Sequence, residues 1–307
     1  MKKIFYIFAL AVITMTSCEK NEVKIQDEAQ KWVELQNNKQ LITLLNQLDS
    51  GKELSELIPN VKFHSMWDLY QEILNANEIK QKELIEKYPN VVRITNYEEG
   101  NEIKLNLNDK TLAKLLSAEG FIKIGKRIIN VDGDVIKVIT NGDKTLIPEL
   151  EKTIVSNCES NIVVEKITSY KEKKHFEPGI QKMVAIWGNW EYYDSTTRCH
   201  WEKWIDYNPV FDYATVGAEV TNQRKSWLGW ANWFSSSSYM YLHLRSDYLD
   251  CTNFSYGVNL LDDPGIDLYD SGNTTNVSVS KRFSDSGNVE SGHVEIDFIY
   301  RGTTYYH

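Results

Sequence analysis

Apolar residues in the first part of the chain recur every three or four positions, which is the spacing of an amphipathic helix. One such run lies within 29–50, and a second covers 63–88. In the second run Ser65 is a suitable N-cap and Pro89 follows the end, as expected at helix boundaries. These patterns predict helices in this part of the chain.

A segment of mixed pattern follows. Residues 105–120 have the pattern of a helix capped by Asn108 or Asp109. Within 121–139, turn residues separate three short apolar runs, and one of these turns contains Asp132–Gly133. Because glycine accepts the positive φ of a tight two-residue turn, the segment predicts a small module of β-hairpins.

After about Lys182, apolar and polar residues alternate with a period of two, the spacing of a strand with one buried face. The alternation is clear in four runs: 215–221, 239–245, 276–280 and 293–300. In the last run, the residues expected to point inward are Val294, Ile296, Phe298 and Tyr300. Turn residues between such runs predict an antiparallel sandwich.

The combined pattern predicts an α+β protein with an α-rich N-terminal part, a small β-hairpin module and a C-terminal antiparallel β-sandwich-like domain. We expect a signal peptide over 1–17 and the α-rich region over 18–180, with its hairpins at about 121–139. The antiparallel β domain is expected over 181–307.

The beginning of the chain has the layout of a secretory signal. Lys2 and Lys3 form a basic segment, and an apolar stretch then leads through small residues to Cys18. The sequence "MTSC" resembles a bacterial lipobox, in which the cysteine is acylated and becomes the new N-terminus. The alternatives are an ordinary secretory signal and an uncleaved anchor. We expect acylation at Cys18, with the protein attached to membrane lipid.

The net charge excludes one class of partner. It is −9 for the whole chain and becomes −11 once residues 1–17, with Lys2 and Lys3, are removed. Such an acidic protein has no electrostatic reason to bind nucleic acid.

The remaining cysteines allow one disulfide. Cys199 and Cys251 could close a loop in an oxidising compartment, which leaves Cys158 unpaired. The alternative is that all three are reduced and buried. The sequence contains no CxxC motif and no zinc-ligand spacing, so we expect neither a metal site nor a cofactor.

The stretch "SWLGWANWF" places Trp227, Trp230 and Trp233 three residues apart, just after Arg224 and Lys225. Both a strand and a short helix fit this spacing. The tryptophans could pack in the core, because each indole buries a large area. They could instead form an exposed surface that contacts sugar rings, a protein partner or the membrane interface.

Several segments resemble a family. The lipobox, "FHSMWDLYQEILN" and "LNDKTLAKLLSAEGFIKIGKRIINVDGDVIKVI" are similar to a group of Bacteroidetes lipoproteins that carry a conserved domain of unknown function. "DYATVGAEVTNQRKSWLGWANW" is similar to a later stretch of the same proteins. The resemblance implies an exported cell-envelope protein and supplies no catalytic residues.

A search for catalytic motifs gives little. The sequence contains no GxSxG, HExxH, Walker or GxGxxG motif. His200, His243 and His293 lie in predicted strands among polar-face residues, so we expect them to be exposed and structural. The acidic loop 262–270 could hold calcium, although its composition is equally that of an ordinary turn. "DST" resembles a short O-glycosylation motif of Bacteroidetes, with Ser195 as the acceptor.

These observations lead to a hypothesis about function. We expect a protein anchored by lipid in the outer membrane, facing either the periplasm or the cell surface. Its role is expected to be non-catalytic, either structural or in binding a polysaccharide or another envelope protein. The alternative is an envelope hydrolase that acts on a glycan or a peptide.

Overall fold

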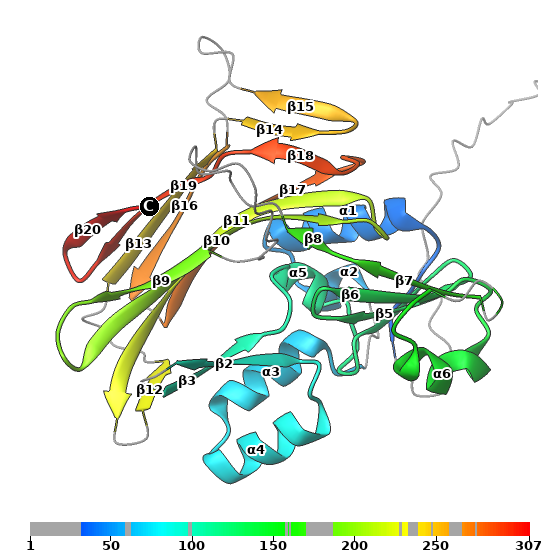
Figure 1. Ribbon diagram of the computed structural model, residues 1–307, viewed down its shortest axis with the longest axis horizontal. Coiled ribbons are helices and arrows are strands. Elements are labelled where there is room, and N and C mark those ends of the chain that lie inside the picture. Colours follow the sequence, from blue (N-terminus) through cyan, green and yellow to red (C-terminus); the bar gives the residue numbers. More distant parts are fainter. Residues whose placement is uncertain are drawn as a thin grey trace, which may run out of the picture.

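A computed structural model describes residues 32–58, 63–97, 100–156, 159, 161–169, 187–226, 229–232, 239–246, 248–257, 266–273 and 275–307. Strands form most of its regular structure, and nearly all of their pairings are antiparallel. The helical part is smaller than the sequence predicts, because a five-stranded sheet shares the N-terminal half with the helices. Figure 1 shows this half, in blue to green, against the strands of the C-terminal half.

The N-terminal half contains short helices and two sheets. Its elements are β1 (Glu34–Leu35), α1 (Asn38–Asp49), α2 (Leu54–Leu57), α3 (Met66–Asn75), α4 (Glu78–Lys87), β2 (Val92–Tyr97), β3 (Gly100–Leu105), α5 (Lys110–Ala113), β4 (Phe121–Ile124), β5 (Arg127–Asp132), β6 (Val135–Ile139), the 3-10 helix η1 (Lys144–Leu146), α6 (Ile147–Lys152), β7 (Ile162–Lys166) and β8 (Thr168–Ser169).

Capping side chains decide where these helices begin. Ser65 caps α3 as predicted, in a reciprocal capping box with Asp68. The predicted run 63–88 is two helices, because Asn77 caps α4 with its side chain. Likewise, Asn37 caps α1, so the described residues before it lie outside the helix and two of them form β1.

The predicted hairpin module is confirmed. Strands β4, β5 and β6 form consecutive hairpins within a sheet of order β1-β4-β5-β6-β7. Asp132 pairs with Val135, so the two-residue turn consists of Gly133 and Asp134, and Gly133 has a φ of +60°. That φ is costly for residues with a Cβ atom, which explains the glycine at this turn.

The C-terminal half consists of strands in the described residues. They are β9 (Trp187–Tyr192), β10 (Thr197–Asn208), β11 (Tyr213–Ser226), β12 (Gly229–Asn232), β13 (Tyr239–Ser246), β14 (Tyr248–Cys251), β15 (Phe254–Gly257), β16 (Ile266–Asn273), β17 (Asn276–Ser284), β18 (Val289–Gly292), β19 (Glu295–Tyr300) and β20 (Thr303–Tyr306).

Two of the C-terminal sheets share one apolar core. In the first sheet β10 pairs with β11, and β11 also pairs with β17 and β12. The second sheet has the order β16-β13-β19-β20. Val216 and Val220 of the first sheet lie in one buried cluster with Leu242 and Phe298 of the second. This arrangement is sandwich-like, and a small sheet of order β15-β14-β18 lies beside it (Figure 1).

The prediction for the last apolar strand is confirmed. Val294, Ile296, Phe298 and Tyr300 are fully buried. Strand β19 pairs with β13 on one side and with β20 on the other, so it is not an edge strand.

Strand β10 departs from the prediction of a single buried face, because all twelve of its residues are buried. One face packs in the sandwich core, and the other contacts the N-terminal half. Val210, Phe211 and Tyr213, at the turn between β10 and β11, belong to the apolar cluster that fills the N-terminal half. The polar face of the sheet is therefore covered by protein.

Candidate functional site

The polar face of β10, β11 and β17 meets β2, β3 and α5 of the N-terminal half. Polar side chains are buried along this contact, which we call the polar seam. Its charged residues are Arg93, Lys104, Asp109, Lys110, Glu202, Asp206, Glu219 and Arg282.

One ionic cluster in the polar seam is centred on Glu202. The Lys104 ammonium lies 2.8 Å from one carboxylate oxygen of Glu202, and the Arg93 guanidinium lies 3.2 Å from the other. Lys104 and Glu202 are each less than a tenth exposed. Buried charges require such partners, since an unpaired charge in a protein interior is expensive.

His200 completes this cluster and corrects the expectation that it is exposed, because only 4% of its surface is accessible. Burial and the positive charges of Lys104 and Arg93 lower the pKa of its ring, which is therefore neutral. Lys104 Nζ lies 2.8 Å from His200 Nδ1. An ammonium group only donates, so Nδ1 accepts and the proton is on Nε2. His243 and His293 are half-buried on the outer face of the sandwich.

A second ionic cluster lies farther along the polar seam. Arg282 of β17 donates two hydrogen bonds of 2.9 Å to the carboxylate of Asp109, and it also pairs with Asp49 at the end of α1. Lys110 pairs with Glu219. Burial alone would raise the pKa of Glu219, but the positive charges of Lys110 and Lys104 lower it to about 2.

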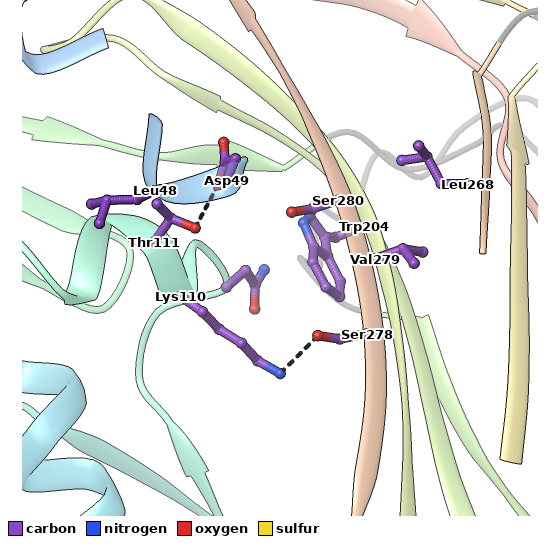
Figure 2. A pocket seen from close by; sticks show the side chains of 10 residues that line it. Leu48, Asp49, Lys110, Thr111, Trp204, Leu268, Ser278, Val279 and Ser280 are labelled. Carbon is purple, nitrogen blue, oxygen red and sulfur yellow. Dashed lines mark hydrogen bonds between the residues drawn. The ribbon is translucent and has the colours of Figure 1, made fainter. Parts of the chain in front are cut away.

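A cavity of about 330 Å³ opens beside this second cluster, between α1, α5 and the sheet. Figure 2 shows Asp49, Thr111 and Lys110 on the side of the N-terminal half, with Trp204, Ser278 and Ser280 on the sheet. Thr111 donates a hydrogen bond of 2.6 Å to Asp49, and Lys110 donates one of 3.2 Å to Ser278. Thr111, Asp49, Lys110 and Ser278 are thus held by partners within the protein.

The indole of Trp204 lies across Gly217 of the neighbouring strand. A Cβ atom at residue 217 would lie 2.3 Å from the ring, so only glycine fits beneath it. Across the same three strands, Trp204 is in register with Gly217 and Gly217 with Ser280. The missing side chain at Gly217 lets the indole reach from β10 toward β17 and form a wall of the cavity.

A different surface lies at the end of the sandwich where β9 turns into β10. Tyr192, Tyr193 and Tyr239 are each about half exposed there. The Arg301 guanidinium lies 4.8 Å from the centre of the Tyr193 ring, and its backbone N–H bonds to the Tyr239 carbonyl. We call Tyr192, Tyr193, Tyr239 and Arg301 the tyrosine end.

The predicted tryptophan stretch belongs to this region of the fold. Trp230 lies in β12, which pairs with the last residues of β11. Lys225 bonds through its backbone N–H to Thr196, in the turn that follows Tyr193. The structure therefore favours the strand interpretation for 229–232. Trp227, Trp233 and the side chain of Trp230 lie outside the described residues.

The predicted disulfide is not formed in this structure. Cys199 and Cys251 are both reduced and buried in the sandwich core. Burial, together with the negative charge of Glu191, raises the pKa of the Cys199 thiol. The thiol is therefore protonated and inert at neutral pH. Cys18 and Cys158 lie outside the described residues.

Ser195 is exposed at the tip of the turn between β9 and β10. Asp194 shapes this turn by accepting hydrogen bonds of 2.6 and 2.8 Å from the backbone N–H groups of Thr196 and Thr197. The hydrogen bond from the Thr196 hydroxyl, followed by these backbone bonds, lowers the pKa of Asp194 to about 2. The hydroxyl of Ser195 is accessible to a modifying enzyme, and its glycosylation stays a prediction.

Two further findings concern only the described part of the chain. No helix there is long and apolar enough to cross a membrane. No group of three or more His, Cys, Asp or Glu residues in that part could hold a metal ion. The acidic loop 262–270 lies partly outside the described residues, and in it Asp270 accepts backbone hydrogen bonds from Ser271 and Ser278.

Comparison with known proteins gives one match. No protein-family model matches the chain, and no curated protein is similar to it in sequence. Among solved structures, it is similar to a DUF4848 family protein from Bacteroides thetaiotaomicron VPI-5482. The two are 13% identical, the match covers 93% of this chain and 98% of that one, and the TM-score is 0.29. That protein belongs to a family of unknown function from a Bacteroides species.

Proposed function

We propose that this is a lipid-anchored protein of the bacterial outer membrane that binds polysaccharide through the tyrosine end. The observation that carries the proposal is the convergence of half-exposed tyrosines and a basic side chain on one end of a rigid sandwich. Phenol rings with one apolar face and one polar tip suit a surface that contacts sugar rings in water.

Neighbouring side chains hold the rings of the tyrosine end in place. Tyr193 packs edge-on against the buried Tyr300, with ring centres 6.4 Å apart. Tyr192 accepts a hydrogen bond of 3.1 Å from Arg198, whose guanidinium lies 3.4 Å from the centre of the Trp190 ring. Side chains fixed in this way lose little entropy when a ligand binds. The backbone of β12, within the tryptophan stretch, pairs with the last residues of β11 near the same end.

The lipid anchor rests on the sequence around Cys18, which lies outside the described residues. Cell fractionation tests it directly. We expect the wild-type protein in the membrane fraction and labelled by a fatty-acid analogue, and the Cys18→Ala variant unlabelled. A variant that is still acylated would contradict the anchor and leave the binding proposal untouched.

Affinity electrophoresis of the full chain in gels containing dextran, galactomannan or hyaluronate tests the binding role. We expect at least one polysaccharide to retard the wild type and not the double variant Tyr193→Ala, Tyr239→Ala. Tyr306→Ala is the matched control, because Tyr306 is an exposed tyrosine whose partner in the sheet is Asp297, away from the tyrosine end. Equal retardation of wild type and double variant, or none in any gel, would contradict the proposal.

A further inference from the structure

We propose that the cavity in the polar seam is a second binding site, distinct from the tyrosine end, for a small neutral polyhydroxylated molecule such as a single sugar ring. Its volume of about 330 Å³ lies at the lower end of the range of pockets that hold small molecules. The walls come from both halves of the chain, from α1 and α5 on one side and from β10, β16 and β17 on the other.

The charges around the cavity favour a neutral ligand. Asp49 and Lys110 are the two charged residues of its wall, and their charges are opposite. Each is also neutralised by a partner, Asp49 by Arg282 and Lys110 by Glu219. An anion or a cation would have to compete with these ion pairs. A neutral hydroxyl group does not compete with the ion pairs. It can form hydrogen bonds with the donor and acceptor atoms of Lys110 and Asp49 that the ion pairs leave available.

The remaining walls match the chemistry of a sugar ring, which combines apolar faces with a polar rim. The indole of Trp204 and the side chain of Leu48 supply apolar surface, whereas Leu268 and Val279 also line the cavity but pack against the sandwich core. The hydroxyls of Thr111, Ser278 and Ser280 and the amide of Asn108 supply polar groups around it. Figure 2 shows the Trp204 indole beside Ser280 on the sheet, with Lys110 on the opposite side of the cavity.

Trp204 provides an independent indication of a ligand. It is only 4% exposed, and its indole N–H is buried without a hydrogen-bond partner among the described residues. A buried donor left unpaired costs stability, and such donors are rare in folded proteins. A ligand hydroxyl that enters beside Ser280 would supply the missing acceptor once the wall relaxes around it.

Isothermal titration calorimetry of the full chain, purified in detergent, tests the site with D-glucose, D-galactose and N-acetyl-D-glucosamine as probes. We expect one of them to bind with a stoichiometry near one. Ser280→Leu should weaken this binding at least about tenfold, because the new side chain fills the cavity. Ser284→Leu is the matched control, since Ser284 is an exposed serine on the same face of β17 outside the cavity.

Trp204→Phe keeps an aromatic wall but removes the N–H, so it should weaken binding roughly threefold to tenfold, the value of one hydrogen bond. Thermal unfolding of each variant verifies that it is folded. The double variant of the tyrosine end should bind the monosaccharide as the wild type does, which separates the two sites. The proposal is overturned if none of the three probes binds, if Ser280→Leu binds as tightly as wild type, or if D-glucuronate binds more tightly than D-glucose.

Discussion

The ring of His307 stacks on the indole of Trp201, with centres 4.2 Å apart and planes inclined by 18°. The backbone of His307 also exchanges two hydrogen bonds with Ile296, of 2.8 and 2.9 Å. Two residues earlier, in β20, Tyr305 stacks on Phe298 with ring centres 5.0 Å apart. Tyr306, between them, points to the opposite side and is exposed. The final residues are therefore part of the sandwich core rather than a loose extension of β20.

Deleting Tyr305–His307 should consequently destabilise the protein. Loss of the two stacked rings and their backbone bonds is expected to lower the free energy of unfolding by about 2–4 kcal/mol. Urea denaturation measures this value. Tyr306→Ala removes an exposed ring at the same end and should change it by less than about 0.5 kcal/mol. Equal stability of truncated and full chains would contradict the stacking.

A longer deletion, of residues 293–307, removes all of β19 and β20. Because β19 is a central strand with three fully buried side chains, and the deletion also removes the buried Val294, we expect the C-terminal sheets to unfold. Limited proteolysis should then cut strands β10 to β17 rapidly. A deletion variant as resistant as the full chain would show that β19 is dispensable.

Asp206 makes stability depend on pH. Its pKa is raised from 3.8 to about 6, mainly by burial and to a smaller extent by the negative charge of Asp109. The hydrogen bonds from Ser169 and Asn108 and the charge of Arg93 act in the opposite direction. Between pH 3.8 and about 6, the carboxyl group of Asp206 is therefore protonated in the folded state and ionised in the unfolded state. The stabilisation is complete below pH 3.8 and is lost as the pH rises through about 6. The loss should reach about 3 kcal/mol.

The variant Asp206→Asn tests this dependence. Its amide can accept from Asn108 and donate to Ser169 Oγ, so it retains both contacts without a charge. Between pH 4 and pH 7.5 (about the interval in which Asp206 titrates), the wild type should lose stability relative to this variant in urea denaturation. The contributions of the other titrating groups cancel when the free energy of unfolding of the variant is subtracted from that of the wild type. A difference that does not change with pH would rule out a protonated Asp206.

Glu202 neutralises the buried Lys104 and the partly buried Arg93, so its removal should be severe. Glu202→Ala leaves the charges of Lys104 and Arg93 without their carboxylate, and we expect a loss of about 3–5 kcal/mol. Adding Lys104→Met should restore part of the loss, because one stranded charge is then gone. Chemical denaturation of the double-mutant cycle gives the coupling energy. Strictly additive losses would contradict the ionic cluster.

Gly217→Ala should force the Trp204 indole out of place. With a Cβ atom 2.3 Å from the ring, overpacking is expected to cost about 1–3 kcal/mol. Trp204→Ala is destabilising by itself, but the double variant should be more stable than the sum of the two single changes implies, because the clash is absent. The comparison uses thermal and urea unfolding, and full additivity would show that the two residues do not interact.

Local features of this protein follow from its sequence. Ser65 begins a helix because its hydroxyl accepts from a nearby backbone N–H, and Gly133 forms a hairpin turn because it lacks a Cβ atom. The alternation of Val294, Ile296, Phe298 and Tyr300 puts four side chains on one face of a strand. Each of these depends on neighbours along the chain, and each appears in the fold as predicted.

Tertiary structure, by contrast, decides what covers the polar face of strand β10. In strand β10, Arg198, His200, Glu202 and Asp206 lie on one face and alternate with a mainly apolar face, a pattern equally typical of a face in contact with water. The ionic cluster of the polar seam needs Arg93 and Lys104, which are about a hundred positions earlier and carry no motif. The tyrosine end likewise joins residues from separate hairpins. Sequence periodicity fixes which side chains share a face, but long-range packing determines whether that face meets solvent, a buried partner or a cavity.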